Sequence, residues 1–246
     1  METPHFTAGG QLKKITIGAS LTSLNTYAFD DCPKLKTVRV SKSNHVLYAK
    51  DNMLINKKKK SVIWIAPAKK KVVIPNGTKV IGDYCFYGSK AESLVIPKSV
   101  KKIGKKALEA SDLEKIRLKK GNKVYAKDGS CIYKKKTKEL VVVTASKGGQ
   151  VVKISPKVKK ITRDAMTAGD NFIVNDGSSL DYIVIPASTI LCDSWYQFYK
   201  AGYITCDVVF RGKTLPKYSS GAQNIFPLFC TYYVPKGMVK KYKNWI

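Results

Sequence analysis

The histidines of this chain are the first residues to test for chemistry, and only two are present, His5 and His45. His45 has Asp51 nearby in the sequence, but a histidine held by a carboxylate also needs an activated serine or cysteine beside it. No nucleophile-elbow pattern of the Gly-x-Ser-x-Gly kind appears in the chain. We therefore interpret both histidines as ordinary surface or packed residues.

The acidic residues and the glycines give no further sign of catalysis. The 17 Asp and Glu residues are scattered along the chain, whereas hydrolysis by paired carboxylates needs two of them across one bond. The glycines form neither a P-loop nor a dinucleotide-binding loop. The sequence therefore predicts a protein that is not an enzyme and that holds no cofactor.

The six cysteines lack the spacing of a metal site. None forms a Cys-x-x-Cys pair, and two histidines are too few to complete a zinc site, so no metal is expected. Cys32 and Cys85 stand where related stretches have serine or alanine, which favours buried thiols. Cys192, Cys206 and Cys230 lie in the C-terminal third, where either buried thiols or, in an oxidising compartment, a disulfide is compatible with the sequence.

The basic residues are the strongest chemical signal. Lys and Arg total 45 and the formal charge is +28, and such a field attracts anionic polymers. Lysine clusters fall in predicted turns, where they act either as solvated charge that protects β edges or as a polyanion site. These are Lys57, Lys58, Lys59, Lys60, Lys134, Lys135 and Lys136. Lysine offers point charges and no aromatic stacking platform accompanies it, so sequence-specific nucleic-acid binding is not expected.

The elements that must position these residues form an internal repeat. One apolar position recurs as Leu24, Ile81, Ile103 and Ile161. Four residues later comes a small residue followed by a large apolar one, in the pairs Ala28–Phe29, Cys85–Phe86, Ala107–Leu108 and Ala165–Met166. Each copy runs into a strand-like alternation, at residues 35–40, 93–97, 113–118 and 181–186. Such self-similarity predicts stacked coils, because one coil cannot bury its own apolar face.

Two glycines follow the recurring apolar position directly. Gly82 and Gly104 are expected to allow a tight or positive-φ backbone before the outer segment of the coil.

The repeat is interrupted twice by a longer segment that is itself duplicated. Residues 46–75 resemble residues 123–155: each has a strand, a Lys-Asp-Asn or Lys-Asp-Gly turn, a second strand, a lysine-rich turn and a longer strand. We therefore predict antiparallel β-meanders inserted at about 44–75 and 122–155.

The combined pattern, Val-x-x-Ile-Gly-x-x-Ala-Phe followed by Leu-x-x-Ile-x-Ile-Pro, resembles the BspA-like leucine-rich repeats of bacterial cell-surface and secreted proteins. "YAKDG" at 125–129 looks like the hairpin found between such repeats, and "YVPKG" at 233–237 is similar to the end of many members. The resemblance implies a β-rich leucine-rich-repeat solenoid with short helical or irregular outer segments, and a parallel sheet plus the inserted meanders. It predicts an N-terminal tail at 1–11, the solenoid at 12–207, and a C-terminal repeat with a capping helix at 208–246.

The resemblance also implies a non-enzymatic recognition or adhesion module that binds a host protein, matrix or glycan partner. Residues between the buried ones of each strand point outward, and among these we expect Arg39, Lys115, Arg117 and Tyr182 to contact the partner. The alternatives are a cationic protein that binds polyanions, such as wall polymer, anionic glycan or non-specific nucleic acid, and a structural repeat scaffold.

Two sequence features bear on the location of the protein. No apolar run reaches the roughly 18 residues of a spanning helix. "METPHFTAGG" lacks the pattern of a signal peptide, so the chain is expected to be either cytosolic or a mature fragment without its leader. With the resemblance, we expect a secreted or cell-surface protein that is monomeric.

Overall fold

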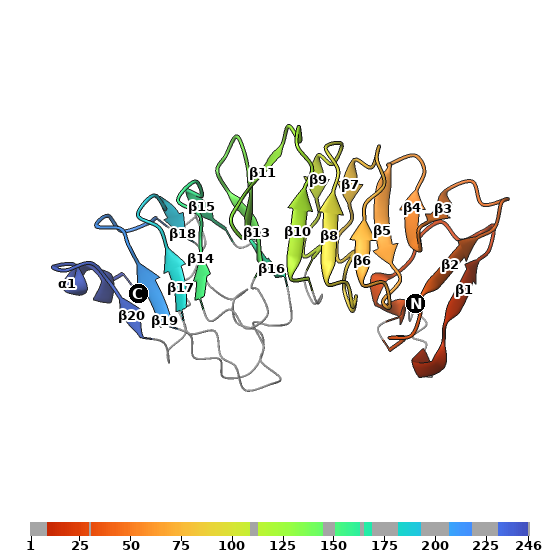
Figure 1. Ribbon diagram of the computed structural model, residues 1–246, viewed down its shortest axis with the longest axis horizontal. Coiled ribbons are helices and arrows are strands. Elements are labelled where there is room, and N and C mark those ends of the chain that lie inside the picture. The colour runs from red at the N-terminus through yellow and green to blue at the C-terminus, as the bar shows by residue number, and fades with distance from the viewer. Residues whose placement is uncertain are drawn as a thin grey trace. The chain divides into compact units, whose positions relative to one another are not determined.

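The computed structural model describes residues 9–29, 31–108, 113–144, 151–162, 165–168, 182–192, 207–217 and 231–245. The chain divides into two compact units, unit 1 at Met1–Lys123 and unit 2 at Val124–Ile246. In each unit short strands stack coil upon coil, with little helix (Figure 1). Parallel sheets and antiparallel meanders are both present, which confirms the predicted repeat solenoid.

Unit 1 begins with a short 3₁₀ helix and continues almost entirely in short strands. Its described elements are η1 (Gly9–Gln11), β1 (Lys14–Ile17), η2 (Thr26–Phe29), β2 (Thr37–Val40), β3 (Leu47–Lys50), β4 (Met53–Asn56), β5 (Ser61–Ile65), β6 (Lys71–Val73), β7 (Val80–Ile81), β8 (Ser93–Ile96), β9 (Lys102–Ile103) and β10 (Lys115–Leu118).

The parallel strands of unit 1 are held in exact register by their buried row. Strands β6, β8 and β10 lie side by side (Figure 1), with Val72 opposite Leu94 and Leu94 opposite Ile116. These three side chains are at most 5% exposed, and burying each contributes about 1.5–3 kcal/mol. A shift of one residue would expose these apolar side chains to solvent, so the apolar pattern fixes the register.

The first meander consists of β3, β4 and β5, which pair antiparallel in sequence order. Strand β5 then pairs in parallel with β7, and β7 with β9, so the meander merges into a second sheet of the solenoid. Strand β6 lies inside the predicted insertion at 44–75, yet it pairs in parallel with β8. The meander interpretation of residues 71–73 was wrong, because their alternating burial matches the main ladder.

The recurring positions of the repeat lie in the core as expected, with two exceptions at half-buried sites. Ile81 and Ile161 are buried, whereas Leu24 and Ile103 are half-buried. The following pairs Cys85–Phe86 and Ala107–Leu108 have no exposed surface. Near the N-terminal end, Phe29 packs against Trp64 with ring centroids 5.3 Å apart.

Gly82 and Gly104 are required because the neighbouring coil leaves no room for a Cβ atom, and neither has a positive φ. A Cβ on Gly104 would lie 2.2 Å from Asp83 Oδ1 and 2.6 Å from Asp83 N, in the preceding coil. The left-handed conformation occurs two residues later, at Tyr84 (φ 52°) and Lys106 (φ 51°). The expectation of a tight backbone at Gly82 and Gly104 is confirmed, and the positive φ predicted as its alternative lies elsewhere.

A buried asparagine closes the coil before the first meander. Asn44 has no exposed surface, and its side-chain amide donates to the carbonyls of Gly18 and Leu21, each at 2.8 Å. Its Oδ1 accepts from the backbone N–H groups of Val46 and Leu47. Asn122, 2% exposed, donates in the same way to the carbonyls of Pro97 and Val100. Such hydrogen-bonded buried amides fix the loop geometry, since a missing partner would be costly.

Unit 2 repeats this plan with fewer described residues. Its elements are β11 (Tyr125–Asp128), β12 (Cys131–Lys134), β13 (Leu140–Thr144), β14 (Val151–Lys153), β15 (Lys160–Ile161), β16 (Met166–Ala168), β17 (Tyr182–Ile185), β18 (Leu191–Cys192), β19 (Asp207–Phe210), β20 (Tyr232–Tyr233) and α1 (Val239–Lys243). Strands β11 to β13 form the second antiparallel meander, and β14, β17, β19 and β20 form a parallel sheet. Strand β14, inside the predicted insertion at 122–155, belongs to that parallel sheet.

The C-terminal helix covers the end of the unit 2 core. Tyr242 is 1% exposed, packs against Phe210 with ring centroids 4.9 Å apart, and donates its hydroxyl to the carbonyl of Gly212 at 2.9 Å. Trp245 stacks edge-on against both rings. Val239, in the first turn of the helix, is 65% exposed.

Candidate functional site

The residues first considered for catalysis do not assemble. His45 is exposed in the loop before β3 and Asp51 is exposed in the β3–β4 turn, while His5 lies outside the described residues. Within the described ranges, no three His, Cys, Asp or Glu side chains gather as metal ligands. Nor, among these ranges, is any helix long and apolar enough to cross a membrane.

The described cysteines lie in the core. Cys32, Cys85, Cys131 and Cys192 have no exposed surface. Burial raises the pKa of the Cys85 thiol far above its usual value, so this group stays protonated and is a poor nucleophile. Cys192 is a free, buried thiol. Cys206 and Cys230 lie outside the described residues, so for these two the alternatives of buried thiols and a disulfide both stay open.

One cluster in unit 2 has the residue types of a catalytic group. Ser155 Oγ donates to Asp128 Oδ2 at 2.6 Å, Lys157 Nζ lies 3.3 Å from Asp128 Oδ1, and the backbone N–H of Ser155 points at Cys131 Sγ at 3.4 Å. The Ser155 hydroxyl and the Lys157 ammonium lower the pKa of Asp128, while burial raises the pKa of Cys131. The Asp128 carboxylate thus connects the end of β11 to the segment after β14 through Ser155 and Lys157. Its lowered pKa makes it a weak base.

The exposed face of the β6–β8–β10 sheet carries two rows of side chains. In one row Val73 lies opposite Val95 and Val95 opposite Arg117. The second row is Lys71, Ser93 and Lys115. Val73 is 52% exposed, and Lys71, Lys115 and Arg117 are exposed as well. The arrangement is an apolar spot bordered by three cations.

The equivalent face of unit 2 has a different chemistry. Along β14, β17, β19 and β20 the outward rows are Val151, Tyr182 and Asp207, and then Lys153, Val184, Val209 and Tyr233. The rings of Tyr182 and Tyr233 have centroids 5.9 Å apart. The Tyr233 hydroxyl donates to the Asp207 carboxylate, and this bond raises the pKa of Tyr233. This face is aromatic and aliphatic, with one carboxylate and one lysine.

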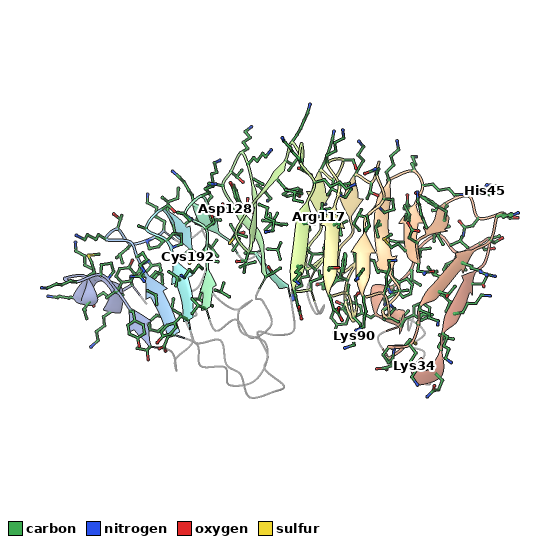
Figure 2. All side chains as sticks on the ribbon, viewed as in Figure 1. Lys34, His45, Lys90, Arg117, Asp128 and Cys192 are labelled. Carbon is green, nitrogen blue, oxygen red and sulfur yellow. The ribbon has the colours of Figure 1, made fainter. Side chains whose placement is uncertain are left out.

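The four residues predicted to bind a partner do not share one sheet. Lys115 and Arg117 are both exposed on β10, of which Figure 2 labels Arg117. Arg39 is exposed on β2, in the separate β1–β2 sheet. Tyr182 belongs to β17 in unit 2. All four side chains alternate with buried ones, as the strand pattern requires, and Tyr182 is half-buried.

Most of the predicted turn lysines are exposed, Lys134 is half-buried, and two of the ammonium groups are engaged. Lys57 Nζ donates to the carbonyl of Asn44 at 2.5 Å, and Lys134 Nζ forms an ion pair with Glu139 Oε1 at 3.0 Å. Lys58 and Lys59 are exposed in the β4–β5 turn, and Lys136 in the β12–β13 turn. These turns are thus partly structural and partly cationic surface.

Comparison with known proteins connects this architecture to a family. The model of the BspA type leucine rich repeat region matches six copies, over residues 2–68 and 66–145. The chain belongs to this family. No curated protein matches the sequence significantly.

Solved structures are similar to this BspA-type protein at low identity. The pneumococcal vaccine antigen PcpA is 19% identical, with a TM-score of 0.50, and the match covers 95% of this chain and 53% of PcpA. A leucine rich cell surface protein from Faecalibacterium prausnitzii is 20% identical, with a TM-score of 0.48, and the match covers 82% of this chain and 48% of that one. A leucine-rich repeat protein from Eubacterium ventriosum is 21% identical, with a TM-score of 0.42, and the match covers 82% of this chain and 69% of that one. The chain spans about half the length of the first two proteins.

Two features of this BspA-type protein's surface escaped the sequence prediction. Val73 and Lys71 were assigned to the meander, although the alternation in "KVVI" at 71–74 is the same signal that located β8 and β10. The contact between Tyr233 and Asp207 joins strands β19 and β20, whose register no motif in the sequence specifies.

Proposed function

We propose that this protein is a non-enzymatic recognition module of the bacterial cell surface, secreted or surface-attached, which binds a protein partner through the exposed face of β6–β8–β10. Membership of the BspA-type family supports the repeat-scaffold role and the surface location. Repeat proteins use extended sheet faces for binding, because each coil adds side chains in a regular row.

The single observation that carries this proposal is the composition of that face. Val73 is 52% exposed and continues into half-buried Val95, and exposed Lys71, Lys115 and Arg117 border the two. An apolar centre with a charged border is the usual anatomy of a protein interface. The cations select a partner whose contact surface is acidic. We propose Arg39 on β2 and Tyr182 on β17 as further contacts, each on the outward face of its own strand.

The test is a double substitution on β10. Lys115→Ala with Arg117→Ala should weaken binding of a partner isolated with the wild-type protein by at least about tenfold, since an interfacial arginine alone often accounts for that much. Both side chains are exposed, so the melting temperature should hardly change. Surface plasmon resonance measures the affinity.

A matched control removes two charges elsewhere in unit 1. Figure 2 shows Lys34 and Lys90 at the loop edge below the strands. Lys34→Ala with Lys90→Ala should leave the affinity within about twofold, because charges outside the contact mainly affect association rates. An equal loss in both double variants would show that net charge and not the β10 face determines binding, and would refute the proposal.

A further inference from the structure

The C-terminal end of unit 2 presents a basic surface that the proposed function does not use. The sequence from 208 to 246 contains no Asp or Glu, whereas basic residues recur along it. Those next to the C-terminal helix have exposed side chains. We call them the cap cations: Arg211, Lys213, Lys236, Lys240, Lys241 and Lys243.

The packing of α1 on the core brings these charges together. Figure 1 shows α1 beyond β20, at the end of unit 2. The buried Tyr242 donates its hydroxyl to the carbonyl of Gly212 at 2.9 Å, so the loop after β19 lies against the helix. Arg211 and Lys213 flank Gly212 in that loop. The loop and the helix therefore form one basic surface, although they are separated in the sequence.

An apolar side chain lies among the cap cations. Val239 is 65% exposed, the highest value among the large apolar residues exposed in the described ranges. It precedes Lys243 by four residues, which makes the two side chains neighbours on the helix surface. Met238 and Tyr242 supply the buried contacts of this segment. Core packing therefore does not require an apolar residue at position 239.

We propose that the cap cations and Val239 bind the surface of an anionic lipid membrane. The cations would lie close to the lipid phosphates, and the valine would enter the boundary between headgroups and acyl chains. Peripheral membrane contacts combine these two contributions, electrostatic attraction to anionic headgroups and burial of apolar area. A sulfated glycan or a wall polymer uses the charges alone, so the exposed valine is the observation that favours lipid.

The aromatic residues of the α1 segment do not favour nucleic acid. Tyr242 and Trp245 both pack their rings against Phe210. Sites for single-stranded nucleic acid instead turn aromatic rings outward, where the bases stack on them. An acidic protein is the competing occupant of this surface, and a failure of the wild-type protein to bind lipid vesicles would favour it.

The test compares two triple variants that each remove three charges from the full chain. The cap variant is Lys240→Gln, Lys241→Gln and Lys243→Gln. The control variant, in the exposed β4–β5 turn of unit 1, is Lys58→Gln, Lys59→Gln and Lys60→Asn, since asparagine tolerates the left-handed backbone at position 60 (φ 49°). Co-sedimentation measures binding to vesicles of equal parts phosphatidylglycerol and phosphatidylcholine, with vesicles of phosphatidylcholine alone in parallel.

The wild-type protein should bind the anionic vesicles and not those of phosphatidylcholine alone. The cap variant should bind at least about thirtyfold more weakly, because each basic residue next to an anionic leaflet contributes about fivefold. The control variant should stay within about threefold at about 0.15 M salt, where the field of a charge fades within about 8 Å. Equal losses in both variants, or no binding by the wild-type protein, would overturn the proposal.

Val239→Gln separates a membrane from other polyanions, because it leaves every charge in place. It should weaken vesicle binding about fivefold, since the burial of most of a valine side chain is lost, and leave the affinity for a heparin oligosaccharide unaltered. Val239→Phe should strengthen vesicle binding at least about threefold, a gain that no loss of folding can produce. If both variants bound vesicles as tightly as the wild-type protein, the surface would act through charge alone and the assignment to lipid would be wrong.

This proposal does not rest on the β6–β8–β10 face. The Lys115→Ala and Arg117→Ala pair should bind vesicles like the wild-type protein, and the cap variant should keep its affinity for the protein partner. Failure of the membrane proposal and failure of the proposed function can therefore be told apart.

Discussion

Units 1 and 2 have the same backbone plan, but the exposed faces of their parallel sheets differ in residue chemistry. In each, a meander merges into one set of short strands while a second set forms a parallel ladder. The outward face of β6–β8–β10 is cationic around an aliphatic spot, whereas that of β14–β17–β19–β20 pairs Tyr182 with Tyr233 and holds Asp207. Backbone hydrogen bonds align Lys60, Lys79 and Lys101 on successive turns of unit 1. In unit 2 the exposed Ile190 interrupts the corresponding row.

This difference teaches which residues the fold requires. The buried rows are nearly interchangeable: Val72, Leu94 and Ile116 in unit 1 correspond to Val152, Ile183 and Val208 in unit 2, all at most 5% exposed. Packing constrains them, because each buried side chain must fill the space left by its neighbours. The outward rows carry no such packing constraint, so their residue types are free to differ between the two units.

The largest expected effect concerns the tetrapeptide Tyr-Ala-Lys-Asp, which occurs in both meanders. Tyr125 is 3% exposed, whereas Tyr48 is 37% exposed. Tyr125→Ala should therefore lower the free energy of unfolding by about 3 kcal/mol, as for other buried aromatic truncations. Tyr48→Ala should cost below about 1 kcal/mol. Thermal unfolding followed by circular dichroism measures both, and equal losses would show that the two tyrosines share one environment.

The same tetrapeptide shows where sequence prediction reached its limit. The repeat, the meanders and the buried rows follow from apolar periodicity. The sequence comparison, however, aligned Tyr48 with Tyr125, while the strand pairing makes Leu47 the counterpart of Tyr125: Leu47 lies opposite Asn56, and Tyr125 opposite Lys134. A one-residue shift reverses which face each side chain takes.

The cause of this shift lies in the turns. Asp51 and Asn52 form the first two-residue turn, both with positive φ, whereas Gly129 and Ser130 form the second. Asp51 is thus a turn residue, and Asp128 is the last residue of a strand. Identical letters take different registers because turn chemistry, and not the motif, decides where the strand ends.

The candidate site was predictable only in part, for a related reason. Arg39, Lys115 and Arg117 were correctly placed on outward positions, because alternation along a strand determines them. The alignment of Lys60, Lys79 and Lys101 on successive turns could not be found this way, because unequal stretches of sequence separate them and only the hydrogen bonds between turns align them. Contacts between coils are non-local, so single motifs do not encode them.

A second comparison concerns the position after the recurring isoleucine, which is Gly104 in unit 1 and Thr162 in unit 2. A Cβ on Gly104 would collide with the backbone of Asp83, which cannot move aside without breaking the stack. Gly104→Ala should therefore destabilise unit 1 by about 2 kcal/mol, in the range of other overpacked sites.

The matched substitution is Thr162→Ala, which removes a hydroxyl whose partner is Glu139 Oε1 at 3.4 Å. It should cost below about 1 kcal/mol, because the bond is long and partly exposed. Hydrogen exchange resolves the effects by unit: Gly104→Ala should speed exchange in β7 and β9. If β7 and β9 of the Gly104→Ala variant exchanged at the wild-type rate, the close approach of Gly104 to the Asp83 backbone would be contradicted.

The smallest expected effect compares the two aspartates of the repeated tetrapeptide across pH. The Ser155 hydroxyl and the Lys157 ammonium hold the pKa of Asp128 below its ordinary value. A carboxyl whose folded pKa is lowered stabilises the protein fully above its unfolded pKa, and this contribution disappears as pH falls through the folded value. Asp128→Asn should therefore reduce stability at neutral pH, by below about 1 kcal/mol since a third of the side chain is exposed. The difference from wild type should vanish in acid.

Asp51→Asn, in the exposed turn of the first meander, should change stability little at either pH, because asparagine also tolerates a φ of 50°. Hydrogen exchange of β11–β13 at neutral and acidic pH measures the first effect. A deficit of Asp128→Asn that persisted undiminished in acid would assign its cause to lost packing and not to the charge on Asp128.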